Sequence, residues 1–153
     1  MATIQWFPGH MSKARRQVQE SIKFVDFVTI LVDARLPLSS QNPMLTKIVG
    51  DKPKLLILNK ADLADPNLTK EWQAYFESQG IKTLAINSKE QSAVKKATEA
   101  AKKLMADKLA RQRERGIQIE TLRTMIIGIP NAGKSTLMNR LAGKKIAIVG
   151  NKP

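Results

Sequence analysis

The chain has 153 residues, contains no cysteine and carries a net charge of +13, from 26 Lys and Arg against 13 Asp and Glu. This length is enough for one domain with its own core, and a hydrophobic content of 42% argues against gross disorder. The absence of cysteine excludes a disulfide scaffold, a thiolate metal site and a cysteine nucleophile.

Apolar runs alternate with helical patterns along the chain, which is typical of parallel strands joined by crossover helices. The predicted helices lie within 1–25 and at 42–49, 66–79, 89–115 and 134–142. The predicted strands lie at 27–33, 54–58, 81–86 and 123–129, and a further element begins at 146–149. These elements predict an α/β protein of three layers, with a mainly parallel sheet between helices.

Spacings of three and four residues give the predicted helices apolar faces. The first helix, capped by Ser12, carries Ala14, Val18, Ile22 and Val25 on that face. The helix at 66–79 carries Leu68, Trp72 and Phe76, and the long helix at 89–115 carries Val94, Ala97, Ala101, Leu104 and Met105.

Residues 128–135 have the sequence Gly-Ile-Pro-Asn-Ala-Gly-Lys-Ser, which fits the phosphate-binding pattern G-x-x-x-x-G-K-[ST] between a strand and a helix. Glycines let backbone N–H groups approach phosphates, and the helix amino end adds partial positive charge. We expect Lys134 to reach the β- and γ-phosphates and Ser135 to bind Mg²⁺. The predicted nucleotide-binding residues of this segment are Asn131, Ala132, Gly133, Lys134, Ser135 and Thr136. A chance glycine turn is the weaker alternative in this context.

A second pattern, Asn59-Lys60-Ala61-Asp62, fits N-K-x-D, the element that recognises guanine in GTP-binding proteins. It follows an apolar strand directly, where an α/β sheet presents its ligands. A carboxylate at Asp62 can accept two hydrogen bonds from guanine, whereas adenine offers neither donor, and Lys60 can lay its methylene stem on the base. A solvated turn residue is the plainer interpretation of Asp62 taken alone.

The segment Asn87-Ser88-Lys89 follows the third predicted strand, where GTP-binding proteins have a short loop around the base. We therefore predict Asn87 and Ser88 as nucleotide-binding residues on position alone. Ser88 could instead cap the long helix, and both roles are compatible. Because N-K-x-D precedes the phosphate loop, the reverse of the usual order, the chain is predicted to be a circularly permuted GTP-binding domain over 1–153.

Two further strings carry a family resemblance: Trp6-Phe7-Pro8-Gly9-His10-Met11 and Asp33-Ala34-Arg35-Leu36-Pro37. Together with the ordered motifs above, they resemble the ribosome biogenesis GTPase A family over essentially the whole chain. The resemblance implies a P-loop GTPase fold and a role in late maturation of the large ribosomal subunit, with GTP hydrolysis stimulated by that subunit. Its partners would be ribosomal RNA and ribosomal proteins, its ligands GTP or GDP with Mg²⁺.

The resemblance also implies roles for single residues. His10 would orient or activate the attacking water, a task that suits an imidazole near neutrality, although by itself His10 could be a packed turn residue. Asn131 would help to hold K⁺; alternatively, it could be a turn residue that tolerates an unusual backbone angle.

The family pattern continues beyond Pro153 with a switch threonine, a D-x-P-G segment and a helical RNA-binding domain. We therefore expect this chain to be a fragment or a truncated product that binds nucleotide weakly and hydrolyses GTP poorly. Its Mg²⁺ shell would lack the switch threonine, and the strand at 123–129 would become an exposed edge because the switch-region strands are missing.

The excess positive charge predicts a polyanionic partner, chiefly RNA. The candidate RNA-binding residues are Lys13, Arg15, Arg16, Lys102, Lys103, Arg111, Arg113 and Arg115. A merely solvated cationic surface is the alternative. No signal segment or bilayer-length apolar run is present, so we expect a cytoplasmic monomer that does not bind membranes.

Three other functions are also compatible with the sequence. The chain could be a nucleotide-gated RNA-binding module with incidental chemistry, or an assembly GTPase of the small subunit with the same permuted order. An ATPase with a chance N-K-x-D pattern is the third alternative.

Overall fold

The described part of the computed structural model comprises residues 16, 18–35, 49–117, 122–128, 137, 139 and 146–148. Its centre is a five-stranded parallel sheet with the strand order β3-β2-β1-β4-β5. The strands are β1 (Phe27–Asp33), β2 (Lys54–Asn59), β3 (Lys82–Ala85), β4 (Leu122–Gly128) and β5 (Ile146–Ile148). The predicted α/β class, the parallel sheet and the positions of its strands are confirmed. The predicted strand ends differ from the observed ones by no more than one residue.

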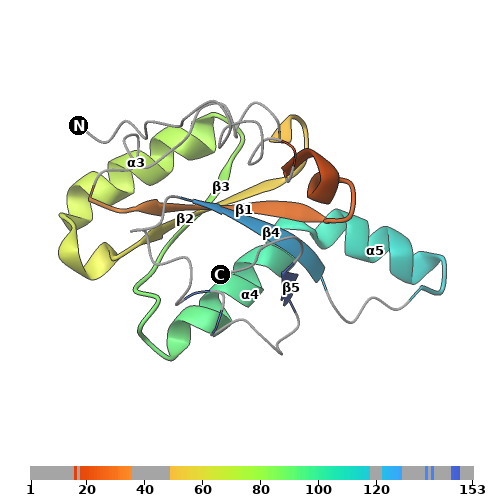
Figure 1. The fold of residues 1–153 in the computed structure, drawn as a ribbon. Coiled ribbons are helices and arrows are strands. Elements are labelled where there is room, and N and C mark those ends of the chain that lie inside the picture. Colours follow the sequence, from red (N-terminus) through yellow and green to blue (C-terminus); the bar gives the residue numbers. More distant parts are fainter. Residues whose placement is uncertain are drawn as a thin grey trace.

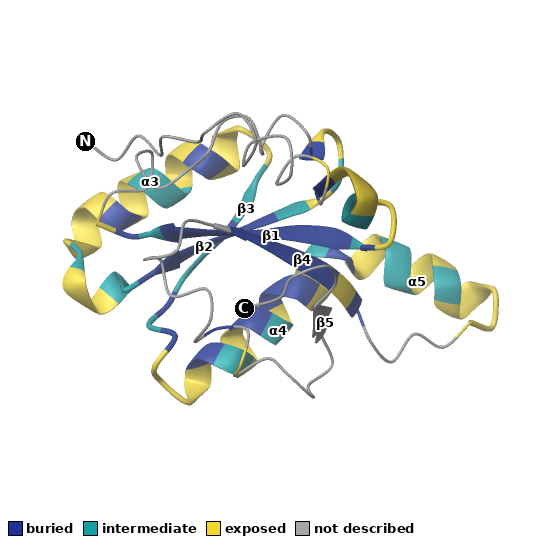
Figure 2. Cartoon of the chain, in the orientation of Figure 1, coloured by how far each residue is buried: buried dark blue, intermediate teal, exposed yellow. Residues whose placement is uncertain are grey.

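Apolar side chains on both faces explain why the central strands form. Along β1 the side chains of Phe27 and Leu31 enter one core, and those of Val28, Ile30 and Val32 enter the other. A strand buried on both faces needs a continuous run of β-branched and large apolar residues, which this segment supplies. Figure 2 shows the resulting sheet as a band of buried residues between layers that face the solvent.

Helix α3 (Pro66–Ser78) covers one face of the sheet (Figure 1). Its amino end is defined by Asp65, whose side chain accepts a hydrogen bond from Asn67 N at 2.9 Å, and by Pro66 in the first turn. Phe76 is buried and Trp72 partly buried against this face. The prediction for Leu68 was wrong, because it lies 53% exposed on the solvent side of the helix.

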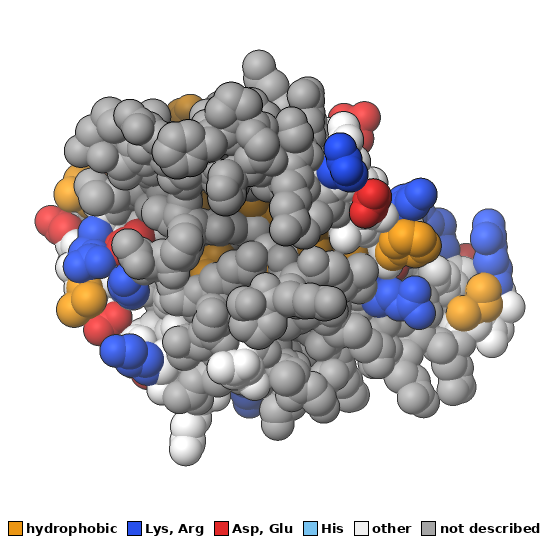
Figure 3. All heavy atoms as spheres, viewed as in Figure 1, with side chains coloured by type: hydrophobic (Ala, Val, Ile, Leu, Met, Phe, Trp, Pro, Cys, Tyr) orange, Lys and Arg blue, Asp and Glu red, His pale blue; other side chains and the backbone are white. Residues whose placement is uncertain are grey.

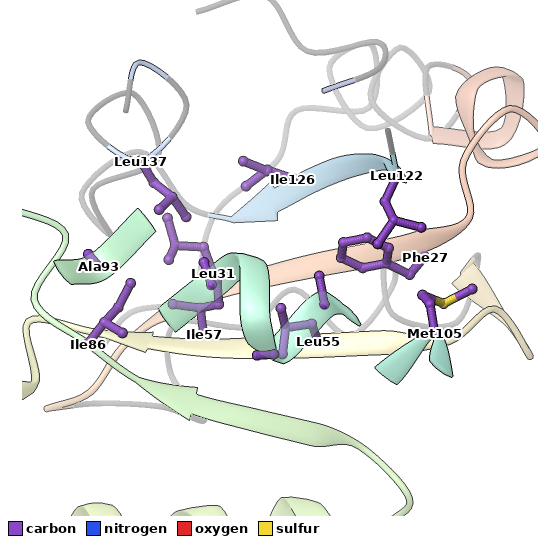
Figure 4. Packing of buried hydrophobic residues seen from close by; sticks show 13 residues of the cluster. Phe27, Leu31, Leu55, Ile57, Ile86, Ala93, Met105, Leu122, Ile126 and Leu137 are labelled. Carbon is purple, nitrogen blue, oxygen red and sulfur yellow. The ribbon is translucent and has the colours of Figure 1, made fainter. Parts of the chain in front are cut away.

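The opposite face is covered by α4 (Ser92–Leu104), which packs small side chains onto the sheet. Its buried residues are Ala93, Ala97, Ala100 and Ala101. Methyl groups let the helix approach closely, and larger strand residues such as Leu31, Ile57 and Ile126 fill the layer beneath (Figure 4). Val94 and Leu104 are partly buried against the same core.

The single long helix predicted at 89–115 is in fact two helices. Helix α4 ends at Leu104 and α5 (Ala106–Glu114) begins after Met105, whose backbone leaves the helical region at φ −100° and ψ 13°. Met105 is buried in the core below α4. The residues that follow, 106–110, are exposed or half-buried, and the unbroken apolar periodicity did not reveal the break.

The edge predicted for the fourth strand was also wrong. Strand β4 pairs with β1 on one side and with β5 on the other, where Leu122, Arg123 and Thr124 face Ile146, Ala147 and Ile148. The short apolar run at 146–148 therefore continues the sheet beyond β4.

Two further predictions concern the amino-terminal third of the chain. Residues 16 and 18–22 are helical, with Val18 and Val25 buried, while Ser12 and Ala14 lie outside the described residues. Of the helix predicted at 42–49, only Val49 is described, in a helical turn before Gly50. None of the described helices is long and apolar enough to cross a membrane.

Asp26, which precedes β1, connects the amino end of this strand to α5 and to β4. Its carboxylate accepts hydrogen bonds from Lys108 Nζ of α5 and from Arg123 N of β4, each at 2.8 Å. Its own N–H donates to Arg123 O at 2.8 Å. Burial opposes ionisation, but the two donors outweigh it, so the pKa of Asp26 lies below its usual value.

We expect Asp26→Asn to lower the free energy of unfolding by about 1–2 kcal/mol at neutral pH, because a charged acceptor is replaced by a neutral one. A group with a depressed folded pKa stabilises the fold above its unfolded pKa and loses that contribution as the pH falls through the folded value. The difference between wild type and variant should therefore shrink below about pH 4. Urea unfolding from neutral to acidic pH measures it, and a difference that does not depend on pH would contradict the assignment.

Candidate functional site

The candidate site lies at the edge of the sheet where the parallel strands end. In register, Asp33 of β1 faces Asn59 of β2, and Leu31 of β1 faces Gly128 of β4. After β1 the chain continues to β2 on one side, whereas after β4 it continues to β5 on the other. The carboxyl ends of β1 and β4 therefore flank a topological switch point, the place where open α/β sheets bind ligands.

Asn59 connects two of the predicted nucleotide-binding segments. Its side chain is almost completely buried, at 1% exposure, and its Oδ1 accepts a hydrogen bond from Ser88 N at 2.9 Å. Its backbone oxygen accepts from Ala34 N at 2.8 Å. Asn59 thus ties the loop after β3 and the loop after β1 to the end of β2.

Lys60 adopts a left-handed backbone conformation, with φ 60° and ψ 34°. Among the described residues it is the only non-glycine with a positive φ. The turn is held by Ala61 N, which donates to Ile86 O at 3.0 Å, and by Leu63 N, which donates to Lys60 O at 2.9 Å. A lysine in this region is energetically unfavourable and persists where surrounding bonds impose it, a situation that recurs at functional sites.

Asp62 lies in the short 3-10 helix η1 (Ala61–Leu63) and is exposed. The hydrogen bond and charge of Asp33 chiefly, and the charge of Asp62 to a smaller degree, raise the pKa of the Arg35 guanidinium. The acidic residue of N-K-x-D is therefore in the turn that follows β2 and is accessible from solvent.

A cluster that sequence reasoning missed lies beside it. The carboxylate of Asp33 accepts hydrogen bonds from Arg35 N at 2.9 Å, Arg35 Nε at 3.0 Å and Arg35 Nη2 at 2.7 Å. Lys60 Nζ lies 3.7 Å from Asp33 Oδ2. The Arg35 hydrogen bond is the main reason why the pKa of Asp33 lies below its usual value. The only signal in the sequence was the Asp-Ala-Arg string at the end of a strand.

The loop after β3 has Asn87 and Ser88 where they were predicted. Asn87 Oδ1 accepts from Lys89 N at 3.1 Å, which folds the loop on itself, and Ser88 is buried. The capping role considered for Ser88 was wrong, because α4 begins at Ser92 and its N-cap residue is Gln91.

The phosphate loop is described only at its two borders. Gly128 ends β4 at the switch point, and Leu137, a helical residue, is fully buried in the core below α4 together with Leu31 and Ile126 (Figure 4). The predicted residues Asn131, Ala132, Gly133, Lys134, Ser135 and Thr136 lie outside the described residues, as do His10, Lys13 and Arg15. The described part of the chain holds no cluster of three acidic, histidine or cysteine residues that could bind a metal ion.

Known proteins resemble this chain in sequence and in fold. Residues 123–153 match a family described as 50S ribosome-binding GTPase. Ribosome biogenesis GTPase A of Bacillus pumilus is 53% identical over 151 residues, which cover 99% of this chain and 54% of that protein. This chain is therefore similar in sequence to ribosome biogenesis GTPase A over nearly its whole length. It spans about half the length of the curated relatives that it matches.

More distant relatives extend the similarity. Ribosome biogenesis GTPase A of Thermotoga maritima is 34% identical, covering 98% of this chain and 50% of that protein. Mitochondrial ribosome-associated GTPase 1 of Bos taurus is 36% identical, covering 97% and 46%. The crystal structure of GNP-bound YlqF from T. maritima superposes with a TM-score of 0.58 at 24% identity, covering 91% of this chain and 57% of the other, which shows a shared fold.

The predicted basic residues of this chain are exposed where they are described. They are Arg16 in the first helical segment, Lys102 and Lys103 in α4, and Arg111, Arg113 and Arg115 at the end of α5. Figure 3 shows Lys and Arg side chains along the end of the molecule formed by α5. Lys108 differs from them because it is paired with Asp26.

We expect Asn59→Ala to lower the free energy of unfolding by roughly 2 kcal/mol, because the buried N–H of Ser88 loses its acceptor. Asn87→Ala is the matched control, since its hydrogen bond to Lys89 N is exposed, and it should cost less than about 1 kcal/mol. Denaturant unfolding and hydrogen exchange at the Ser88 amide measure both effects. Equal losses in the two variants would contradict a special role for Asn59.

Proposed function

We propose that this chain binds guanine nucleotides and hydrolyses GTP during late assembly of the large ribosomal subunit. The observation that carries the proposal is the position of the N-K-x-D segment and of Gly128, which begins the phosphate-loop pattern, at one edge of the sheet around its switch point. The names of its relatives, among them ribosome biogenesis GTPase A, support the same activity and the same setting.

In this proposal the nucleotide lies across the end of β1. Its base is recognised beyond β2, where Asp62 accepts the hydrogen bonds of guanine and Lys60 packs its stem on the ring. Asn87 and Ser88 complete the base pocket from the end of β3. The phosphates lie beyond β4, against the backbone of 131–136, with Lys134 at the β- and γ-phosphates.

Two cations are part of the proposal. Ser135 would provide a hydroxyl ligand to Mg²⁺, which neutralises phosphate charge when it is bound. Asn131 would help to hold K⁺.

His10 would orient the attacking water, because a neutral imidazole can accept a proton near neutral pH. In this assignment residues 1–153 form one GTP-binding domain whose order is circularly permuted.

We propose ribosomal RNA as the polyanion that meets the basic residues. Lys102, Lys103 and the three arginines of α5 are exposed on the α4 and α5 side, away from α3. With Lys13, Arg15 and Arg16 they would contact phosphates rather than base edges, so they would add affinity without sequence preference. Ribosomal proteins of the large subunit would be further partners.

The guanine assignment is tested by Asp62→Asn. The amide puts a donor where guanine has its own amino group, so GDP affinity should fall by at least about a hundredfold. Xanthine has an oxygen at that position, so the variant should bind xanthosine diphosphate better than GDP. Calorimetric titration of wild type and variant with both nucleotides and with ADP measures the change.

Asp65→Asn is the matched control for this experiment. Asp65 is also exposed and lies three residues further on, but its side chain caps α3. It should keep the GDP affinity of wild type and lose a little stability. Unchanged nucleotide preference in Asp62→Asn would refute the guanine site, and a wild-type preference for ADP would favour an ATPase.

The RNA surface is tested by the double variant Lys102→Gln, Lys103→Gln. If both lysines neutralise phosphates, the slope of log K against log salt should become shallower by about 2 for a ribosomal RNA fragment. The control is Lys52→Gln, Lys70→Gln, which removes the same charge elsewhere and should leave the slope closer to that of wild type. Equal changes in the two double variants would point to general charge rather than to a binding surface.

A further inference from the structure

Asp33 occupies the centre of the candidate site without a role in the proposed function. It ends β1, faces Asn59 in register, and lies one strand from Gly128. A nucleotide with its base beyond β2 and its phosphates beyond β4 would have to pass over this position. A carboxylate there calls for an explanation, because it would repel a phosphate chain.

The contacts of Asp33 supply that explanation. Its side chain is 13% exposed and accepts three hydrogen bonds from Arg35, two of them from the guanidinium. Lys60, in the turn that follows β2, has its Nζ 3.7 Å from Oδ2 of the same carboxylate. One negative charge is therefore surrounded by two positive ones, and the cluster of the three side chains has a net charge of +1. Such a cluster attracts an anionic ligand instead of repelling it.

The hydrogen-bond geometry separates the tasks of the two cations. Arg35 is on the same loop as Asp33 and binds it through parallel N–H groups, which hold the carboxylate in one orientation. Lys60 belongs to the N-K-x-D segment, so its attraction to Asp33 links the end of β1 to the turn after β2. The backbone of Lys60 itself is in the unfavourable left-handed region, so this attraction acts at the strained turn.

We infer that Asp33 is a positioning residue for the guanine-reading loop: its carboxylate, oriented by Arg35, holds Lys60 so that the lysine stem lies along the base. The inference rests on the proposed guanine-nucleotide site and adds a residue to it. Asp33 does not contact the base itself. It acts through Lys60, and it fixes the turn that presents Asp62.

The inference is tested by a double-mutant cycle with Asp33→Asn and Lys60→Met. Asparagine keeps an oxygen that accepts from Arg35 N but loses the charge, and methionine keeps a stem but has no ammonium group. Asp33→Asn alone should weaken GDP binding about tenfold. In the Lys60→Met background the same change should weaken it by less than about twofold, because the group through which it acts is gone.

Asp26→Asn is the matched control. Asp26 immediately precedes the same strand and is also a partly buried carboxylate paired with a lysine, Lys108. Its loss should reduce stability while leaving GDP affinity within about twofold of wild type. The comparison separates loss of positioning from general weakening of β1.

A second measurement does not need the nucleotide. Hydrogen exchange at the amides of Ala61 and Leu63, which close the turn, should be at least about threefold faster in Asp33→Asn than in wild type. In Asp26→Asn the amide of Ile30, in the middle of β1, reports any general weakening of the strand. The exchange rates of Ala61 and Leu63 should rise by no larger a factor than the rate of Ile30.

The outcomes separate this inference from the proposed function. Additive effects in the cycle, or an unchanged turn in Asp33→Asn, overturn the role of Asp33 even when wild type binds GDP tightly. A wild type that binds no guanine nucleotide refutes the proposed site. Faster exchange at Ala61 and Leu63 in Asp33→Asn would then still support the part of the inference that concerns the turn.

Discussion

The buried hydrogen bond from Ser88 N to Asn59 Oδ1 is the constraint on which the arrangement of the site depends. Loops at the end of a sheet are the parts of an α/β protein least restrained by the core. Asn59 restrains these loops because it is buried at the end of β2 and is held in register with Asp33 of β1. A residue of this kind makes the relative position of two loops as reproducible as the register of the strands themselves.

The charge of the chain is arranged so that it does not disturb this core. Both faces of the sheet are covered by apolar residues, and buried polar side chains such as Thr29 and Thr124 pair with each other, at 2.9 Å between their hydroxyl oxygens. Carboxylates appear instead at the two ends of β1, each with a cationic partner. An excess of +13 is therefore compatible with folding because the described Lys and Arg side chains remain in contact with solvent.

Much of the fold followed from the sequence because strands buried on both faces leave a strong pattern. The run at 27–33 has no polar residue except Thr29 before Asp33, and its limits were predicted without error. The break at Met105 could not be predicted, since an apolar residue there continues the helical periodicity whether or not the backbone does. Leu68 was predicted wrongly for a related reason: periodicity predicts which residues share a helix face but not how deeply each of them is buried. In the site, N-K-x-D was recognisable as a string, whereas the cluster of Asp33, Arg35 and Lys60 depends on two strands lying side by side.

Strand β1 also limits how the proposed nucleotide site and the proposed RNA surface can influence each other. Its carboxyl end carries Asp33 at the candidate nucleotide site, and Asp26 at its amino end anchors α5, which bears part of the basic surface. The seven residues between and including Phe27 and Asp33 span roughly 23 Å. They are packed on both faces, and close-packed interiors do not deform gradually. Coupling between distant sites requires an element with two alternative arrangements, and a strand held in register by both neighbours is not such an element. If nucleotide state controls affinity for RNA, the control must act through loops at the carboxyl edge that reach the RNA directly, rather than through the sheet to α5.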